Sequence, residues 1–227
     1  MIYITGASSG IGKVLFEHFS EEGLNVAGTY NHTVPESKNL KHLTKVDICN
    51  SKNVADWIAK NTDTSGANIL INCAGINYTS LAHKADLEAW QNVINVNLIG
   101  TFNAIHGVLP LMRENGYGRI INFSSIVAQK GTRGTSAYAA SKSALYGLAK
   151  SIAVENATKG ITINNISLGY FDIGMIREVT EKFRSALLET IPNKSLGHPT
   201  DIISTVKYII DTAYLNGTSI DLSAGLV

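Results

Sequence analysis

Cysteine is scarce in this chain, with only Cys49 and Cys73 among 227 residues. Their separation matches no common metal-ligand spacing, and two thiols are too few to build a disulfide framework. Proteins without disulfides, whose thiols stay reduced, are typical of the cytoplasm. We therefore expect a cytoplasmic protein without a metal site.

Long apolar runs are missing, and so is a strong charge of one sign. No run approaches the roughly 18 apolar residues that a membrane helix needs. The opening letters MIYITG lack the basic start and apolar stretch of a signal peptide. The formal net charge is only +1, without a basic stripe. We therefore expect neither a membrane nor a nucleic acid as partner, and a small-molecule substrate instead.

Charged residues make up only 16% of the chain, whereas hydrophobic residues reach 44%. A disordered protein needs the opposite balance. A length of 227 residues lies within the single-domain range, which extends to roughly 250 residues. We therefore expect one folded domain over residues 1–227.

Short β-rich segments alternate with longer helical patterns. Strands are predicted over residues 1–5, 25–30, 43–48, 68–73, 119–123, 161–166 and 218–221, and helices over 10–22, 87–113, 137–159, 175–189 and 201–212, with another through 54–59. This alternation with apolar strands indicates an α/β fold with a parallel sheet covered on both faces, and right-handed crossovers make that sheet doubly wound. Ligands of such sheets bind at the carboxyl ends of the strands.

A glycine-rich turn, TGASSGIG, follows the first predicted strand. Gly6, Gly10 and Gly12 have no Cβ, so they permit a sharp turn and a close approach of backbone to a phosphate. The following helix N-terminus offers free N–H groups to a pyrophosphate, with the hydroxyls of Ser8 and Ser9 beside it. A helix-capping loop without a ligand is the alternative for an isolated glycine pattern, but the position after the first strand favours a dinucleotide.

Tyr138 and Lys142 stand four residues apart in SAYAASK and therefore share one face of a predicted helix. A nearby ammonium lowers the pKa of a phenol, which helps tyrosine to donate a proton to a carbonyl. Ser125, at the carboxyl end of a predicted strand, can hold the same carbonyl oxygen, and Asn97 can hold a water or a backbone group. The alternative for Tyr138 and Lys142 alone is a surface pair in which the lysine stem covers the ring.

Taken together, TGASSGIG, NCAG, Asn97, Ser125 and YAASK closely resemble the short-chain dehydrogenase/reductase family, over essentially the whole chain. The subgroup most similar in appearance is the single-domain type that includes β-ketoacyl-ACP reductases and many carbonyl reductases. The resemblance implies a Rossmann-like sheet of about seven strands and NAD(P)H-dependent reduction of a ketone or aldehyde to an alcohol, with 3-oxoacyl thioesters among the candidate substrates. It also implies a cofactor-binding half, about residues 1–95, and a catalytic and substrate half, about residues 96–227.

The resemblance further implies a role for each catalytic residue. Tyr138 is the acid/base, Lys142 also holds the nicotinamide ribose hydroxyls, Ser125 polarises the carbonyl, and Asn97 anchors a proton-relay water. The predicted cofactor contacts are Gly6, Ser8, Ser9, Gly10, Ile11, Gly12, Tyr30, Asn31, His32, Asp47, Ile48, Asn72, Ala74, Gly75, Tyr138, Lys142, Gly169 and Phe171. The candidate substrate contacts, by family position only, are Gln129, Tyr170 and Met175.

The second predicted strand ends in GTYNH, and the first carboxylate after it is Glu36. A carboxylate at the strand end would bind the ribose hydroxyls of NAD and repel a 2′-phosphate. Ser9, Asn31 and His32 can instead donate hydrogen bonds to that phosphate, with Lys13 near in sequence. We therefore expect NADP(H), with NAD(H) as the alternative.

Two residues depart from the family pattern in SLGYFDIGM. Leu168 replaces a proline, and Ile173 replaces a threonine whose hydroxyl in the family meets the nicotinamide carboxamide. These changes motivate the alternative that the chain is a dinucleotide-binding regulatory protein with little turnover. Nucleotide-sugar epimerases and dehydratases fit less well, since they carry a further substrate domain for which 227 residues leave no room.

The helix predicted over 137–159 is apolar on more than one face, which is wider than packing on one sheet requires. A helix with two apolar faces usually buries both, so we expect a homodimer or homotetramer. Residues of about 174–196 are expected to cover the substrate, with their basic residues balanced by Glu178, Glu181 and Glu189.

Overall fold

The computed structural model describes residues 1–35, 42–62, 68–177 and 179–227. Seven strands form one sheet in which every neighbouring pair is parallel. In spatial order they are β3 (Leu43–Lys45), β2 (Val26–Tyr30), β1 (Ile2–Thr5), β4 (Ile69–Asn72), β5 (Gly118–Ser125), β6 (Ile161–Leu168) and β7 (Ser219–Leu222). The predicted doubly wound, single-domain α/β fold is confirmed, and its strand order reverses between β1 and β4.

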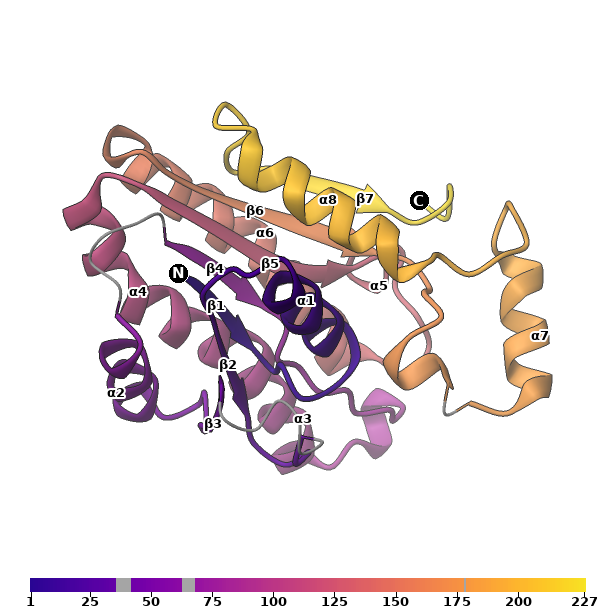
Figure 1. Cartoon of the computed structure of the whole chain (residues 1–227). Helices are drawn as coiled ribbons and strands as arrows, with labels where there is room; N and C mark the ends of the chain where they lie inside the picture. Colours follow the sequence, from indigo (N-terminus) through magenta and orange to yellow (C-terminus); the bar gives the residue numbers. More distant parts are fainter. Residues whose placement is uncertain (36–41, 63–67, 178) are drawn as a thin grey trace.

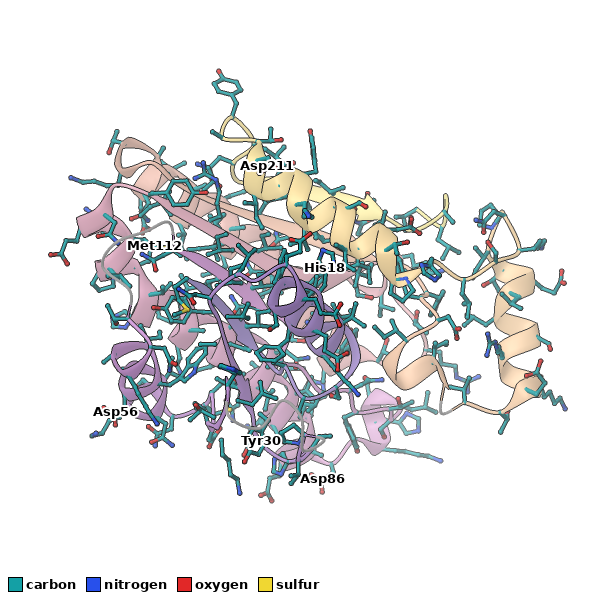
Figure 2. All side chains as sticks on the ribbon, viewed as in Figure 1. His18, Tyr30, Asp56, Asp86, Met112 and Asp211 are labelled. Atoms are coloured by element: carbon teal, nitrogen blue, oxygen red, sulfur yellow. The ribbon has the colours of Figure 1, made fainter. Side chains whose placement is uncertain are left out.

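Helices cover both faces of the sheet (Figure 1). On one face, α1 (Gly10–Glu21) and α8 (Pro199–Asp211) form a core cluster with Ile4 and Ile166. On the other face, Leu70 and the fully buried Met112, which is labelled in Figure 2, belong to a second cluster. The helices of that second layer are α2 (Ser51–Lys60), α4 (Thr101–Asn115) and α6 (Ser136–Asn156).

The strands are buried on both sides because each helical layer packs on one face. In β1, Ile2 and Ile4 belong to the first cluster and Tyr3 to the second, since successive side chains of a strand point to opposite faces. Every residue of β5 and of β6 is buried. Such continuous burial is typical of a parallel sheet between two helical layers.

Three predicted elements differ from the observed ones. The helix predicted over 87–113 consists of α3 (Leu87–Ile94), a π-helical stretch η3 (Asn95–Gly100) and α4, because a pattern with a 3.6-residue period does not register a wider π turn. The strand predicted over 43–48 ends at Lys45. The helix predicted over 175–189 is divided into η5 (Gly174–Arg177) and α7 (Glu181–Thr190), and α7 projects beyond the strand ends (Figure 1).

Short helices complete the structure. The turn η2 (Ala82–Lys84) and the helix α5 (Val127–Lys130) were outside every predicted element, while η4 (Ala157–Lys159) continues α6 to the predicted end of that helix. Within the described ranges, no helix has both the length and the apolarity to cross a membrane. Over the same residues, no group of three or more His, Cys, Asp or Glu side chains is arranged to hold a metal ion.

Candidate active site

A cavity of about 1000 Å³ lies at the carboxyl ends of β1, β2 and β4, where the strand order reverses. This is the place at which open α/β sheets bind their ligands. The cavity is lined by a dozen of the predicted cofactor contacts, namely Gly6, Ser8, Ser9, Gly10, Ile11, Tyr30, Asn31, His32, Asp47, Ile48, Ala74 and Gly75. The structure therefore brings most of the predicted cofactor residues around one space.

The glycine turn forms one wall of the cavity. Gly6 has a φ of +68°, and a Cβ at this position would lie 2.8 Å from the Ala74 Cα atom. A Cβ at Gly12 would lie 2.2 Å from the Gly6 carbonyl oxygen, so Gly12 allows α1 to pack on the turn without lining the cavity itself. Ser9 is the N-cap residue of α1, and its side chain makes no capping hydrogen bond. This backbone cradle at a helix N-terminus fits the pyrophosphate of a dinucleotide.

The far end of the cavity is built by the residues that follow β2 and β3. Asn31 and His32 lie side by side, with 3.5 Å between Nδ2 and Nε2, and they follow Tyr30, which is labelled in Figure 2. Asp47 Oδ1 accepts a 2.9 Å hydrogen bond from the backbone N–H of Cys49. Among the described lining residues, Asp47 is the only carboxylate. Glu36, the nearest acid after β2 in the sequence, lies outside the described residues.

The Lys142 side chain is buried beside Tyr138. Its Nζ atom donates a 2.7 Å hydrogen bond to the Phe123 carbonyl and lies 5.7 Å from the centre of the Tyr138 ring. Burial lowers the pKa of Lys142 to about 8, against a smaller raising effect of Cys73. An ammonium whose pKa is close to neutrality can both stabilise an anion and pass on a proton.

Ser125, at the end of β5, acts on the Tyr138 side chain. Burial raises the pKa of Tyr138, and a side-chain hydrogen bond with Ser125 acts in the opposite direction. The Ser125 oxygen also accepts a 3.2 Å hydrogen bond from the Val127 N–H, which leaves its own proton for donation. The net direction is the opposite of the lowering that the spacing of Tyr138 and Lys142 predicts, because burial is the larger effect.

Asn97 lies in the π-helical stretch and is fully buried. Its side chain accepts a 2.8 Å hydrogen bond from the Ile76 N–H and donates to the Ile76 carbonyl and to Ser141 Oγ. A Cβ at Gly75 would lie 3.2 Å from Asn97 Oδ1 and 3.6 Å from Lys142 Nζ. Asn97 therefore ties the loop after β4 to α6 next to Lys142.

Asn72, predicted as a cofactor contact, is buried within the sheet and does not line the cavity. Its Nδ2 atom donates to Asn122 Oδ1 at 2.8 Å, Asn122 Nδ2 donates to Asn165 Oδ1 at 3.1 Å, and Asn165 Nδ2 donates to Ser219 Oγ at 3.1 Å. These residues are paired in register across β4, β5, β6 and β7. We call this row of side chains the amide ladder.

Gly169 and Phe171 lie away from the main cavity. A Cβ at Gly169 would lie 2.8 Å from the Ser223 Cα atom. Phe171 packs against Gly197, and together with Tyr170 both line a second cavity of about 340 Å³. The contacts of Gly169 and Phe171 with a cofactor, and of Tyr170 with a substrate, stay predictions.

The other two candidate substrate contacts also stay predictions. Gln129 is occupied by protein groups, since its Nε2 atom donates to Asp221 Oδ1 at 2.6 Å. The Met175 side chain lies outside the described part of the structure.

Several cavity residues were missed by the sequence analysis. They are Thr29, Thr33, Val46, Cys49, Cys73, Ile76, Asn92, Asn95, Val96, Ile99 and Gly174. Ile173, at the position of the family's nicotinamide-binding threonine, also lines the cavity. The spacing of Asn92, Asn95 and Ile99 along one helical face was a usable signal, because such residues point in one direction.

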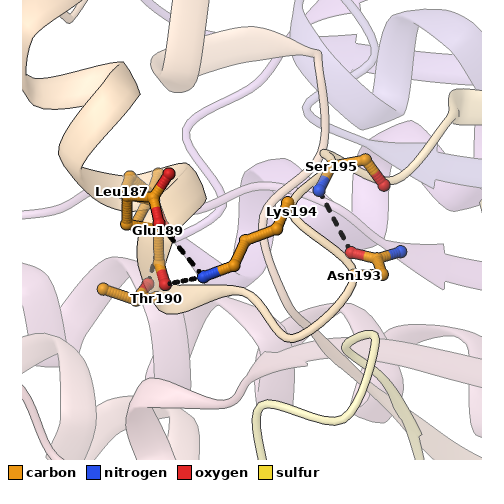
Figure 3. A network of polar contacts seen from close by, with 6 residues as sticks. All are labelled: Leu187, Glu189, Thr190, Asn193, Lys194 and Ser195. Atoms are coloured by element: carbon orange, nitrogen blue, oxygen red, sulfur yellow. Dashed lines mark hydrogen bonds and ion pairs between the residues drawn. The ribbon is translucent and has the colours of Figure 1, made fainter.

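Local polar contacts connect the last turn of α7 with the turn that follows it, within the segment expected to cover the substrate (Figure 3). Lys194 Nζ donates to the Glu189 carbonyl at 2.5 Å and lies 3.2 Å from Glu189 Oε2. Thr190 Oγ1 donates to the Leu187 carbonyl at 2.7 Å. The expected balance of basic by acidic residues is therefore present for Lys194.

Comparison with known proteins agrees with this geometry. The family model described as "short chain dehydrogenase" matches residues 1–184. An acetoacetyl-CoA reductase of Rhizobium meliloti is 35% identical over 98% of this chain and 96% of its own length. Nodulation protein G of Azospirillum brasilense is 32% identical over 98% of this chain and 96% of its own length. A 3-oxoacyl-[acyl-carrier-protein] reductase of Vibrio cholerae is 31% identical, with coverages of 98% and 95%.

Proposed function

The chain belongs to the short-chain dehydrogenase/reductase family, and on this basis we propose that it reduces the 3-oxo group of a 3-oxoacyl thioester with NADPH. It is an NAD(P)-dependent oxidoreductase that interconverts carbonyl and alcohol groups. The names of the similar acetoacetyl-CoA and 3-oxoacyl-[acyl-carrier-protein] reductases support a thioester as the substrate. The observation that carries the proposal is the buried Lys142, whose Nζ atom binds the Phe123 carbonyl on β5, the strand that ends in Ser125, and lies over the Tyr138 ring.

Each residue of the site has its own role in the reduction. When bound, NADPH supplies the hydride that reaches the carbonyl carbon. Ser125 donates a hydrogen bond to the carbonyl oxygen, and Tyr138 gives its phenolic proton to the same oxygen as negative charge develops there. The carbonyl becomes a CH–OH group, and Tyr138 is left as a phenolate. Lys142 stabilises that phenolate and can return a proton to it, because its pKa is about 8.

The preference for NADPH over NADH rests on the end of β2. Asn31 and His32 line the cavity. None of the described lining residues of β2 and of the segment after it carries a carboxylate. Both side chains can donate hydrogen bonds to a 2′-phosphate, whereas an acid there would repel it. Asp47 is the only described carboxylate of the cavity, and one of its oxygens is held by the Cys49 N–H.

A second candidate function is a dinucleotide-binding regulatory protein with little turnover. Ile173 favours it, because an apolar side chain lines the cavity where the family has a threonine hydroxyl for the nicotinamide. The two functions differ in a simple assay. We expect the purified chain to consume NADPH when acetoacetyl-CoA is added and to form the 3-hydroxyacyl product. NADPH binding without consumption, with acetoacetyl-CoA and with a panel of simple ketones, would favour the regulatory protein.

We also propose that the chain forms a homodimer or homotetramer in the cytoplasm. Phe102 on α4 is 43% exposed, and Val154 on α6 is 82% exposed, which leaves apolar area for a second copy. Cys49 and Cys73 are both free thiols, as a reducing compartment favours. Light scattering at micromolar concentration tests the assembly, and a monomer alone would contradict it.

A further inference from the structure

A third residue continues the catalytic face of α6. Tyr138, Lys142 and Tyr146 follow one another at intervals of four residues and therefore lie on one side of the helix. The Tyr146 hydroxyl lies 2.9 Å from Ser167 Oγ on β6 and donates to the Ser125 carbonyl on β5 at 3.5 Å. Tyr146 thus reaches from the catalytic helix to the residue that carries the carbonyl-binding hydroxyl.

Gln129 on α5 extends this contact to the next strand. Its Nε2 atom lies 3.4 Å from the Tyr146 hydroxyl and 3.4 Å from Ser167 Oγ, and it donates to Asp221 Oδ1 on β7 at 2.6 Å. The charged acceptor makes this last hydrogen bond the strongest of the group. We call Tyr146, Ser167, Gln129 and Asp221 the Tyr146 cluster. It joins the carboxyl ends of β5, β6 and β7 to α5 and α6.

The neighbours of Ser125 are held by other contacts. Ser124 Oγ donates to the Lys142 carbonyl at 3.0 Å, and the Ile126 N–H donates to the Leu168 carbonyl at 3.1 Å. Further along, Ser143 Oγ donates to the Ala128 carbonyl at 2.9 Å. These bonds keep β5 and α5 close to α6. Within the Tyr146 cluster, it is the Tyr146 hydroxyl that binds the backbone of Ser125 itself.

We propose that Tyr146 is a positioning residue, whose hydroxyl, held by Ser167 and Gln129, sets the place of Ser125 relative to the Tyr138 hydroxyl. Ser125 and Tyr138 must reach one carbonyl oxygen at the same time, so a small displacement of Ser125 weakens proton transfer and carbonyl polarisation together. Tyr146 has no contact with the cavity that fits the cofactor. The effect therefore falls on turnover and leaves NADPH binding unchanged. This inference rests on the proposed carbonyl reduction.

The test is a double-mutant cycle of Tyr146→Phe with Ser125→Ala, measured on acetoacetyl-CoA or on the ketone that the wild type reduces fastest. We expect Tyr146→Phe to lower kcat about fivefold, the effect of one neutral hydrogen bond, with less than about a twofold change in the KM of NADPH. In the Ser125→Ala background, the same change should have almost no effect on the residual rate, since Tyr146 acts through Ser125.

Two further variants serve as controls. Tyr3→Phe removes another tyrosine hydroxyl, which donates to the Asn61 carbonyl at 3.2 Å, from a residue that does not line the cavity, and should leave kcat unchanged. Ser167→Ala removes the closest partner of Tyr146 and should lower kcat in the same direction. The inference is overturned, while the proposed function stands, if Tyr146→Phe lowers kcat equally in the wild-type and Ser125→Ala backgrounds. It is also overturned if Tyr146→Phe does not lower kcat in a wild-type background that is active. A wild type that reduces no ketone overturns the proposed function, and the inference with it.

Discussion

Lys142 Nζ lies over the Tyr138 ring, 5.7 Å from its centre. Burial acts on both groups in the direction that disfavours charge, so the pKa of the phenol is raised and that of the ammonium is lowered. The ammonium thereby becomes the more acidic of the two groups, whereas in water the phenol is the more acidic one. Such a pair is suited to passing a proton to an alkoxide and recovering it.

Tyr138→Phe should abolish reduction while retaining the cofactor. The variant lacks only the phenolic proton donor, so kcat should fall by a factor of about 10² to 10⁴, with the NADPH dissociation constant within about tenfold of the wild-type value. Steady-state rates and fluorescence titration with NADPH measure the two effects. Tyr208→Phe, on the exposed surface of α8, is the matched control. A kcat close to that of the wild type would remove Tyr138 from the proposed role.

The lowered pKa of Lys142 predicts how stability depends on pH. Its folded pKa is about 8 and its ordinary value is 10.5, so between these values the unfolded chain binds the extra proton. Stability from this group therefore rises with pH across that window. Lys142→Met, which carries no charge, should have the higher unfolding midpoint near pH 7, and its advantage should shrink as the pH rises from about 8 to about 10.5. Urea titrations of both proteins without cofactor give the comparison, and a constant difference would contradict it.

Gly12→Ala should weaken both the fold and cofactor binding. The new Cβ would lie 2.2 Å from the Gly6 carbonyl oxygen, so α1 must move away from the turn. We expect a loss of about 1–3 kcal/mol in the free energy of unfolding and a weaker affinity for NADPH. Gly147→Ala in α6 meets no atom within 4 Å and should instead stabilise the protein by about 0.5–1 kcal/mol. Thermal melts and NADPH titrations distinguish the two variants.

Asn31→Asp should change the cofactor preference. A carboxylate at the end of β2 repels a 2′-phosphate and accepts hydrogen bonds from ribose hydroxyls. The ratio of kcat/KM for NADPH to that for NADH should fall at least about tenfold. Asn25→Asp makes the same change just before the opposite end of β2 and should leave the ratio unaltered. A wild type that already prefers NADH would refute the assignment of NADPH.

The sequence predicted the features that depend on neighbours along the chain. The positions of Gly6 and Gly10 predict a strand-to-helix turn, and the four-residue spacing of Tyr138 and Lys142 places both on one helical face. The sequence did not predict contacts between segments that are far apart along the chain. Gln129 was expected to face the substrate, yet its amide donates to Asp221, 92 residues further along.

Local pattern also failed where a choice depended on three-dimensional surroundings. Nothing in NVNLIG distinguishes an α turn from the π turn that buries Asn97, because both fit the same apolar spacing. The direction of the pKa shift of Tyr138 depends on its burial and on its contact with Ser125. Neither quantity can be obtained from an interval in the sequence.

The amide ladder has a consequence for how the sheet assembles. If β5 slipped by one residue, Asn122 would turn to the other face and leave the amides of Asn72 and Asn165 unmatched in an apolar interior. Each unmade hydrogen bond there costs about 1–3 kcal/mol, so misaligned pairings of the central strands are strongly disfavoured. The heights at which the loop after β4, Ser125 and Gly169 leave the sheet are thus set by uncharged amides in its interior, which do not line the cavity themselves.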